Sequence, residues 1–237
     1  MPEDILSAIR SELQSQADEK TRGGAQRYFK EEAAFYGVKT NLVEKIAREH
    51  FPEVKSLAKK AIFALCEDLL RSDFQEEAFI ACDWSYRLRP DYDERDFATF
   101  ERWLTDYVNN WAKCDTLCNH TIGSFVDIYP QYVQNLKLWA HSSNRWLKRG
   151  SAVTLIIPAK QGKFLPDIFE IADILLKDND DLVQKGYGWM LKDASIMHCP
   201  EVFDYVMRNK KSMPRTALRY AIERMPPDLK SRAMQRD

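Results

Sequence analysis

The helical character of this chain is clearest in residues 57–70, LAKKAIFALCEDLL. Apolar side chains recur there mostly at intervals of three and four residues, at Leu57, Ala61, Ile62, Leu65, Leu69 and Leu70. This spacing places them on one face of an α-helix. A shorter stripe of the same kind joins Ile5, Ile9 and Leu13. Because no alternating strand pattern of any length accompanies these stripes, we predict an all-α protein.

Helix-breaking residues fall between the apolar stripes. Prolines stand at expected helix boundaries, namely Pro52, Pro90, Pro130, Pro166, Pro200, Pro214, Pro226 and Pro227. Asn41 together with Glu44 predicts a capping box at the start of a helix. Eight glycines among 237 residues are few for the turns of a sandwich or barrel. The pattern predicts about a dozen helices of roughly ten to eighteen residues, joined by short turns.

A faint internal period indicates how these helices are organised. Polar helix starts are expected near Asp73, Asn144 and Asp180, which are 71 and 36 residues apart, and a weaker one near Asn109 halves the first interval. Two helices in each unit of ~36 residues are typical of HEAT-like and armadillo-like repeats. We therefore predict one domain over residues 1–237. Its expected fold is a superhelical array of antiparallel helical hairpins, an α-solenoid with a concave basic face.

Charged residues are unevenly distributed along the chain, although they nearly cancel to a net charge of −1. Residues 128–166 contain no Asp or Glu, whereas residues 64–106 are rich in acids and residues 207–237 are rich in bases. The acid-free window carries Lys137, Arg145, Lys148, Arg149, Lys160 and Lys163. This polarity predicts a surface that attracts a polyanion. The alternative is ordinary variation among solvated faces.

Composition also bounds the class of protein and its compartment. Hydrophobic residues make up 45% of the chain, which is enough for a substantial core. Five cysteines, an odd number, are typical of reduced thiols in a cytosolic protein. The start MPED lacks the features of a secretory signal, and no stretch approaches the ~20 apolar residues that cross a bilayer. We expect a cytoplasmic monomer that binds no membrane.

Three sequence blocks hold candidate functional residues. Trp111 and Asp115 are four residues apart and share one face of a predicted helix. Arg149 lies in the acid-free window, and Trp189 lies in a segment where two glycines predict close approach by another surface. Each also has a structural interpretation, because a tryptophan at helical spacing more often belongs to the core, and the aspartate and arginine can be solvated or paired. Other aromatic residues are predicted to be core, among them Tyr28, Phe29, Phe35 and Tyr36.

The same blocks resemble the active-site segments of DNA alkylation-repair glycosylases of the AlkD type, which are built from HEAT-like repeats. The blocks are NWAKCD at residues 110–115, NRWLKR at 144–149 and QKGYGWMLK at 184–192, in matching order and spacing. The resemblance extends from about Thr21 onward and is thin before it. It implies that Trp111 and Trp189 are aromatic platforms, that Asp115 is the catalytic carboxylate, and that Arg149 is the family's active-site arginine.

The resemblance implies a monofunctional glycosylase that excises N3- and N7-alkylated purines, of the 3-methyladenine and 7-methylguanine type, from duplex DNA. Such a base is cationic and leaves without a general acid, so a fixed carboxylate such as Asp115 has only to stabilise the sugar cation. Indole faces attract the cationic nucleotide, and Arg149 would hold a flanking phosphate. The product would be an abasic site. The family also implies action on an exposed nucleotide, whereas most glycosylases extrude the base into a pocket.

Further contacts and alternative functions follow from the same sequence. Candidate contacts to the DNA backbone are Lys148, Lys160, Lys163, Lys185 and Lys192. We expect no cofactor and no metal, since the spacing Cys114-x-x-x-Cys118-x-His120 lacks a second ligand pair. Two other classes stay open. One is a non-catalytic HEAT-like repeat module that binds DNA or RNA through a basic concave face, and the other is a protein–protein scaffold.

Overall fold

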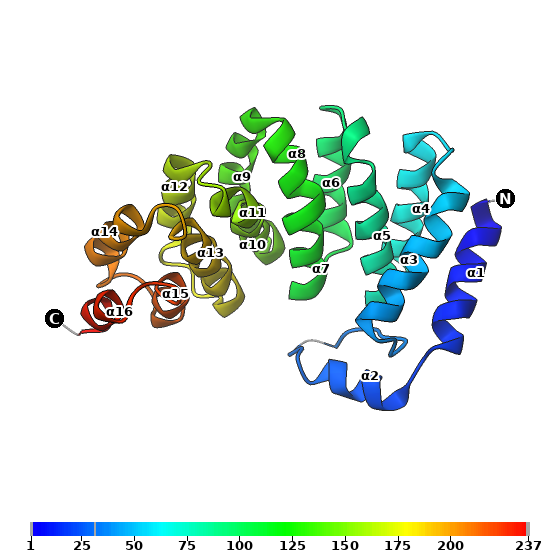
Figure 1. Cartoon of the computed structure of the whole chain (residues 1–237), viewed down its shortest axis with the longest axis horizontal. Coiled ribbons are helices and arrows are strands. Elements are labelled where there is room, and N and C mark those ends of the chain that lie inside the picture. Colours follow the sequence, from blue (N-terminus) through cyan, green and yellow to red (C-terminus); the bar gives the residue numbers. More distant parts are fainter. Residues whose placement is uncertain (1, 31, 236–237) are drawn as a thin grey trace. The chain divides into compact units, whose positions relative to one another are not determined.

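The computed structural model describes residues 2–30 and 32–235, and this part of the chain is built from helices (Figure 1). It contains one isolated parallel bridge, between Ala34 and Phe74, and no strand. The predicted all-α fold of stacked helical hairpins is confirmed. None of the helices in the described residues is both long enough and apolar enough to span a bilayer.

The helices group into two compact units, Met1–Leu117 and Cys118–Asp237. Unit 1 contains α1 (Pro2–Ser15), α2 (Glu19–Gln26), α3 (Thr40–Val54), α4 (Lys59–Arg71), α5 (Gln75–Arg87), the 3-10 helix η1 (Arg89–Asp91), α6 (Asp96–Asp106) and α7 (Trp111–Thr116). The boundary between the units falls inside a π-helix, η2 (Leu117–Ile122). That residues 1–237 form one domain stays a prediction.

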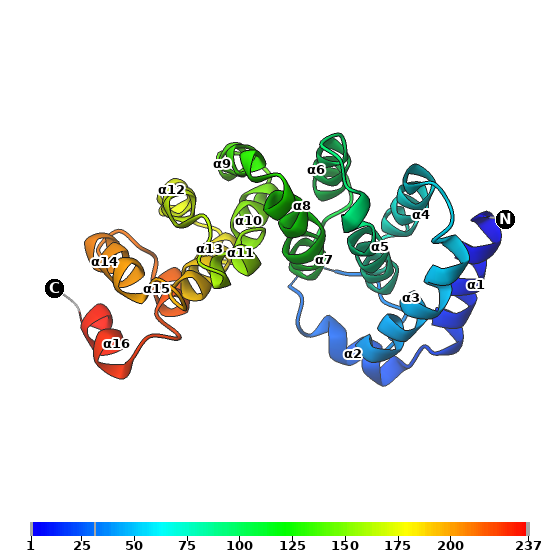
Figure 2. The same ribbon diagram turned by 45° about the horizontal axis from the view of Figure 1, so that its top comes forward.

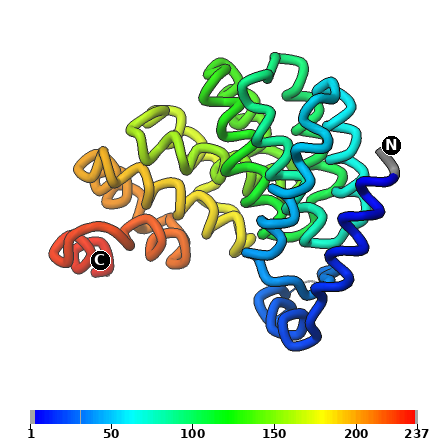
Figure 3. The backbone as a smooth tube through the Cα atoms, turned by 45° about the vertical axis from the view of Figure 1, so that its right-hand side comes forward, coloured from blue at the N-terminus to red at the C-terminus, as the bar shows by residue number. Residues whose placement is uncertain are grey.

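In unit 1 the helices lie in two rows. α3, α5 and α7 are neighbours in one row, and α4 and α6 form the other (Figure 2). α1 packs against α3 and α4, whereas α2 stands apart from both rows (Figure 3). The core between the rows is apolar and aromatic, with Ile62, Leu69, Ile80, Phe100 and Trp103 almost completely buried. α2 contributes no buried residue.

Unit 2 repeats the arrangement in two rows. Its elements are α8 (Gly123–Ile128), the 3-10 helix η3 (Pro130–Tyr132), α9 (Val133–Ala140), α10 (Arg145–Val153), α11 (Ile156–Lys160), α12 (Leu165–Leu175), α13 (Asp181–Ala194), α14 (Cys199–Asn209), α15 (Arg215–Ala221) and α16 (Pro227–Met234). α13 packs against α10 on one side and α15 on the other, while α12 packs against α9. α13 therefore lies at the centre of this unit.

The predicted period of about 36 residues reappears as equivalent hydrogen bonds between neighbouring repeats. In unit 1, Asn109 Nδ2 donates to Asp73 Oδ1 at 2.7 Å, across 36 residues of sequence. In unit 2, Arg145 Nε donates to Asp180 Oδ2 at 2.7 Å, across 35 residues. Because polar helix starts face each other in both units, the period is confirmed.

Several helix boundaries were predictable, and others were not. Asn144 and Asp180 cap α10 and α13, and the predicted boundary prolines from Pro90 onward lie in 3-10 helices or at helix starts. The capping box predicted at Asn41 is wrong, because α3 begins after Lys39 without a side-chain cap. The boundary at Pro52 is also wrong, because this residue lies inside α3. α7 and α8 have 6 residues each, fewer than predicted, because η2 interrupts the helical run between them.

Candidate functional site

The start of α7 is fixed by Asn110. Its side-chain oxygen accepts a hydrogen bond from the backbone N–H of Lys113 at 3.0 Å and so caps the helix. Its amide donates to Gln75 Oε1 on α5 at 3.0 Å. Asn110 and Gln75 are both buried, so the bond between them holds the first turn of α7 against α5.

Trp111 and Asp115 follow this cap on one face of α7, as predicted from their spacing, and both are partly exposed. The ring of Phe29 stacks on Trp111, with centroids 5.2 Å apart and planes inclined by 16°. Trp111 Nε1 donates to the carbonyl of Tyr28 at 3.4 Å. The indole is therefore held at its N–H and covered by Phe29 on one face. A ligand of this ring would meet the other face.

The segment that supplies Phe29 is anchored by a buried carboxylate. Glu76 on α5 accepts hydrogen bonds from the backbone N–H groups of Tyr36, Gly37 and Val38, at 3.1, 2.9 and 3.0 Å. Burial, with a hydrogen bond to Glu77, raises the pKa of the Tyr36 phenol. The connection between α2 and α3 is thus tied to the row of helices that carries α7.

The aromatic residues of this segment are not core, which corrects the sequence prediction. Phe29, Phe35 and Tyr36 are partly exposed, and Tyr28 is 78% exposed. Residues 27–30 and 32–39 lie outside the helices, so these rings belong to no apolar stripe of a helix. The role of Phe29 behind Trp111 has no signal in the linear sequence, where 82 positions separate the two residues (111 − 29).

Lys113 is a second anchor of α7 that the sequence analysis missed. Its side chain is 1% exposed. Its Nζ donates to Asp73 Oδ1 at 2.5 Å, to the Asp73 carbonyl at 2.9 Å and to Asn109 Oδ1 at 3.1 Å. A buried ammonium is stable only when oxygen atoms replace its water shell, and these three do so. Lys113 thereby attaches α7 to the turn between α4 and α5.

Arg149 occupies a buried position in unit 2 and is only 5% exposed. It lies on α10, and its Nη1 donates to the carbonyl of Leu182 in the first turn of α13. A Cβ at Gly186 would meet Arg149 Cγ at 3.4 Å and Nη1 at 3.6 Å. Arg149 therefore bridges α10 and α13. This environment agrees with the alternative interpretation of the sequence, in which the arginine is paired with a neighbour. Its contact with a phosphate stays a prediction.

Trp189 lies on α13 and is partly exposed. Its Nε1 donates to Asp193 Oδ2 at 2.8 Å, and Lys192 Nζ lies over the ring, 5.7 Å from the centroid. That ammonium also lies 5.6 Å from the Tyr220 ring and is ion-paired with Glu223 at 3.2 Å. Neither indole proposed as a platform is buried in the interior.

The two glycines of α13 allow close packing, as the sequence predicted. A Cβ at Gly188 would lie 2.7 Å from Tyr220 Cβ and 2.8 Å from the carbonyl oxygen of Ala217, both on α15. At Gly186 the nearest atom is the Arg149 side chain. One glycine thus lets α15 approach α13, and the other faces the arginine.

Each of the five candidate lysines for DNA contact is ion-paired within unit 2. The pairs are Lys148–Asp178, Lys160–Asp193, Lys163–Asp127, Lys185–Asp181 and Lys192–Glu223. All five carboxylates lie outside residues 128–166. For Lys148, Lys160 and Lys163, which lie in the acid-free window, the window therefore overstates the positive charge, because the fold brings acids from other segments beside them. Their contact with DNA stays a prediction.

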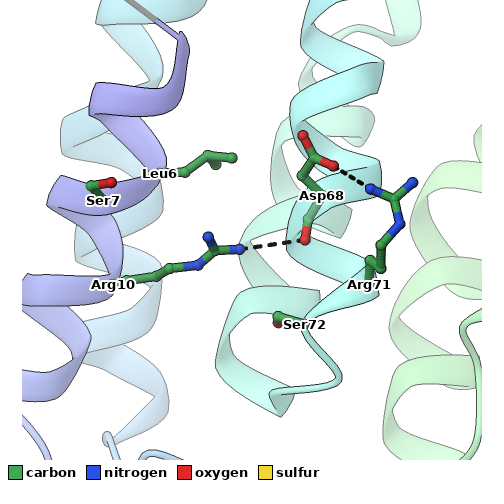
Figure 4. Close-up of a pocket in the computed structure, with 6 residues that line it drawn as sticks. All are labelled: Leu6, Ser7, Arg10, Asp68, Arg71 and Ser72. Atoms are coloured by element: carbon green, nitrogen blue, oxygen red, sulfur yellow. Dashed lines mark hydrogen bonds and ion pairs between the residues drawn. The ribbon is translucent and has the colours of Figure 1, made fainter.

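A further pocket of unit 1 has charged side chains that are already paired. It is lined by Leu6, Ser7, Arg10, Asp68, Arg71 and Ser72 (Figure 4). Both guanidinium groups of this pocket are already engaged: Arg10 with Glu77 at 3.0 Å, and Arg71 with Asp68. An anion would have to displace these carboxylates. Among the described residues, no group of three His, Cys, Asp or Glu side chains is placed to hold a metal ion.

The arrangement thus contains two local centres. Trp111 and Asp115 lie together on α7 in unit 1, while Trp189 and Arg149 belong to the packed pair α13 and α10 in unit 2. Each indole is fixed through its N–H, one by a carbonyl and the other by a carboxylate. The contact between Trp189 and Asp193 could have been predicted from the sequence, because residues four apart on a helix lie on the same face. That the four predicted residues act on one nucleotide stays a prediction.

Comparison with known proteins identifies the family of this chain. Residues 9–225 match the model of a family described as DNA alkylation repair enzyme. A search of curated proteins found no match. Among solved structures, the chain is similar to a "Predicted DNA alkylation repair enzyme from Enterococcus faecalis", with 15% identity and a TM-score of 0.80. The similarity covers 90% of this chain and 98% of that one, so the two share a fold.

Proposed function

This chain belongs to the DNA alkylation repair enzyme family, and we propose that it is a monofunctional DNA glycosylase. Its substrates are cationic purines alkylated at N3 or N7, such as 3-methyladenine and 7-methylguanine, in duplex DNA. It hydrolyses the N-glycosidic bond and leaves an abasic site. Membership in a family of DNA repair enzymes supports the DNA partner, and the side chains of α7 support the reaction.

The observation that carries the proposal is the pair Trp111 and Asp115. Both are partly exposed on one face of α7, and the indole has Phe29 on its other side. Asn110 and Lys113, which are buried, hold this helix in place. An aromatic platform and a carboxylate are thus presented one helical turn apart on a fixed element. This is the arrangement that a cationic nucleotide requires.

The chemistry follows from the charge of the substrate. An N3- or N7-alkylated purine is positively charged, so electrons of the breaking C1′–N bond neutralise the departing base, and no acid has to protonate it. Positive charge develops on the sugar instead, and the Asp115 carboxylate stabilises that charge electrostatically. Water then adds to C1′ and loses a proton. Asp115 would also orient this water.

The other predicted residues have supporting roles in the proposal. The faces of Trp111 and Trp189 attract the cationic nucleotide by up to ~2 kcal/mol each when water is excluded. Arg149 contacts a flanking phosphate, and the five lysines of unit 2 contact the DNA backbone. No lysine is proposed as a nucleophile, so the DNA strand stays intact.

The test is to incubate the protein with methylated duplex DNA and to separate the released bases by chromatography. We expect free 7-methylguanine and 3-methyladenine, with strand breaks only after alkaline treatment. Asp115→Asn keeps the shape of the side chain and removes its charge, so this variant should bind DNA and release almost no base. Asp106→Asn, at the exposed end of α6, is the matched control and should behave as the wild type. Equal release by wild type and Asp115→Asn would end the assignment.

A second candidate is a non-catalytic module that binds DNA or RNA. The buried position of Arg149, with its bond to Leu182, favours a non-catalytic role for this residue, because such an arginine serves the packing of unit 2 without any substrate. The two candidates differ in one result. A binding module would retain methylated DNA on the protein, and neither the wild type nor Asp115→Asn would release a base.

A further inference from the structure

Asp193 is a buried carboxylate that the proposed reaction does not use. It lies on α13, one turn after Trp189, and is 0% exposed. Its Oδ2 accepts the hydrogen bond of Trp189 Nε1–H at 2.8 Å. The N–H is the one hydrogen-bond donor of an indole, so this contact restrains the rotation of the ring about its side-chain bonds.

Two cations lie near this carboxylate without saturating it. Lys160 Nζ is 3.6 Å from Oδ2, and Arg224 Nη1 is 3.5 Å from Oδ1. Both cations are about half-exposed. Asp193 Oδ1 has no hydrogen-bond partner among the described residues. Burying a charge in this way opposes folding unless ions and hydrogen bonds compensate it, so the shortest bond, that to Trp189, is the strongest one available.

The face of the same indole is restrained by a separate group. Lys192 Nζ lies over the ring, and its ion pair with Glu223 holds it there. The ring of Trp189 thus contacts Asp193 through its N–H and Lys192 through one face. A nearby carboxylate at the N–H also makes the ring more electron-rich, which strengthens its attraction for a cation on the remaining face.

We infer that Asp193 is the positioning residue of Trp189: it holds the indole in the orientation that receives the cationic nucleotide, with Lys160 and Arg224 as its counter-charges. The inference rests on the proposed function, because the orientation of Trp189 matters only if this indole binds the nucleotide. Asp193 acts through Trp189 and touches neither the base nor the sugar.

The test measures release of 7-methylguanine from a duplex in a single turnover at saturating protein. Asp193→Ala should lower the rate about tenfold or more, because a misplaced platform no longer meets the nucleotide in a reactive geometry. Asp193→Asn keeps an oxygen acceptor and should retain more of the rate. Affinity for undamaged duplex should be unchanged or tighter, since Lys160 and Arg224 lose their internal carboxylate.

A double-mutant cycle separates positioning from general support of the fold. Trp189→Phe has no N–H to orient, so adding Asp193→Ala to it should change the rate less than twofold. If Asp193→Ala slows the reaction equally in both backgrounds, the inference is overturned. Asp173→Ala on α12 is the matched control, because it removes a carboxylate that accepts the Tyr205 hydroxyl at 2.8 Å elsewhere in unit 2.

A measurement without catalysis keeps the two proposals distinguishable. The indole N–H signal of Trp189, assigned by its loss in Trp189→Phe, should exchange with solvent at least about tenfold faster in Asp193→Ala than in the wild type. Unchanged exchange overturns the inference even if the enzyme is active. Failure of the wild type to release any alkylated base overturns the proposed function. A wild type that is active, with Asp193→Ala equally active, overturns the inference alone.

Discussion

At the residue scale, the ammonium group of Lys113 is buried two positions before Asp115, where it meets Asp73 and Asn109. Asp73 itself is half-exposed and has a positive φ of 68°. The two partners of this ion pair therefore have unequal surroundings. Loss of the lysine leaves an aspartate that water can solvate, whereas loss of the aspartate leaves an ammonium that water cannot reach.

We predict an asymmetric response to substitution at this pair. Asp73→Asn, which preserves the turn, should lower the free energy of unfolding by about 1–3 kcal/mol, because the buried ammonium loses its counter-charge. Lys113→Met, which fills most of the same volume, should lower it by less than about 1 kcal/mol. Urea unfolding of both variants measures the difference, and the opposite order would contradict the account.

The sequence identified the chemistry of single residues better than their surroundings. That Trp111 and Asp115 share one face of a helix followed from their spacing. The partial exposure of Trp111 did not follow, because a tryptophan at helical spacing more often belongs to the core. The anchoring contacts of Glu76 and Lys113 could not be predicted, because these partners are 38 to 40 residues away in sequence and depend on how helices pack.

At the element scale, α13 has a packed neighbour on each side. Gly188 faces the backbone of α15, and Gly186 faces the flexible Arg149 side chain. A methyl group at the first position would overlap the Ala217 carbonyl oxygen, which cannot move without shifting α15. At the second position a methyl group makes an ordinary contact.

The two glycines should therefore respond differently to the same change. Gly188→Ala should reduce stability by about 1–3 kcal/mol, since overpacking outweighs the gain in helix propensity. Gly186→Ala should be neutral or stabilising by up to about 1 kcal/mol, because only the propensity changes. Thermal unfolding of both variants tests this. Similar losses of stability in the two variants would contradict the conclusion that α15 leaves no room for a side chain at Gly188.

Glu67 connects α4 to α6 and gives unit 1 a defined acid sensitivity. Arg102, Tyr107 and Trp103 all donate to its carboxylate. The Arg102 hydrogen bonds, opposed by burial, lower the pKa of Glu67 from 4.5 to about 2. Because the pKa is lower in the folded state, the ionised carboxylate contributes its stability above about pH 4.5 and loses it as the pH falls toward 2.

We predict that Glu67→Gln flattens the acid limb of the stability profile. The wild type should lose about 1–2 kcal/mol from this group between pH 4.5 and 2, after allowance for solvent screening of the half-exposed Arg102. Glu49→Gln, on the exposed face of α3, is the control and should keep the wild-type profile. Parallel profiles for wild type and Glu67→Gln would contradict the assigned role.

The helix starts at Asn144 and Asp180 were predictable, because these side chains cap the backbone locally, and the start expected near Asn109 lies at Asn110. The π-helix after α7 was not, since nothing in LCNHTI differs from an ordinary helical pattern. Helices of this type occur often at functional sites. Here one begins two residues after Asp115.

At the scale of the whole molecule, the period of about 36 residues predicted the repeat fold. Contacts between equivalent positions of neighbouring repeats, such as Asn109 with Asp73, have this spacing. The charge pattern of the sequence was a poorer guide to the surroundings of single lysines. Lys148 and Lys163 lie in an acid-free window of sequence and still face Asp178 and Asp127. A linear charge window misses these pairs because the carboxylates come from segments 30 to 36 residues away in sequence.

DNA binding through several phosphate contacts should depend strongly on salt. If several lysines and arginines contact phosphates, the affinity for duplex DNA should fall ~10³-fold or more between 50 and 200 mM salt. Fluorescence anisotropy of a labelled duplex measures this dependence. Affinity that is absent at low salt, or unaffected by salt, would favour the scaffold alternative over any nucleic-acid function.

The central claim is that one carboxylate on α7 stabilises the sugar cation while an alkylated purine departs. Its most direct measurement is the single-turnover rate of 7-methylguanine release from a duplex with one such base, at saturating protein. The account predicts that Asp115→Asn lowers this rate at least ~100-fold with the Kd for DNA unchanged. A variant that releases the base as fast as the wild type would contradict it.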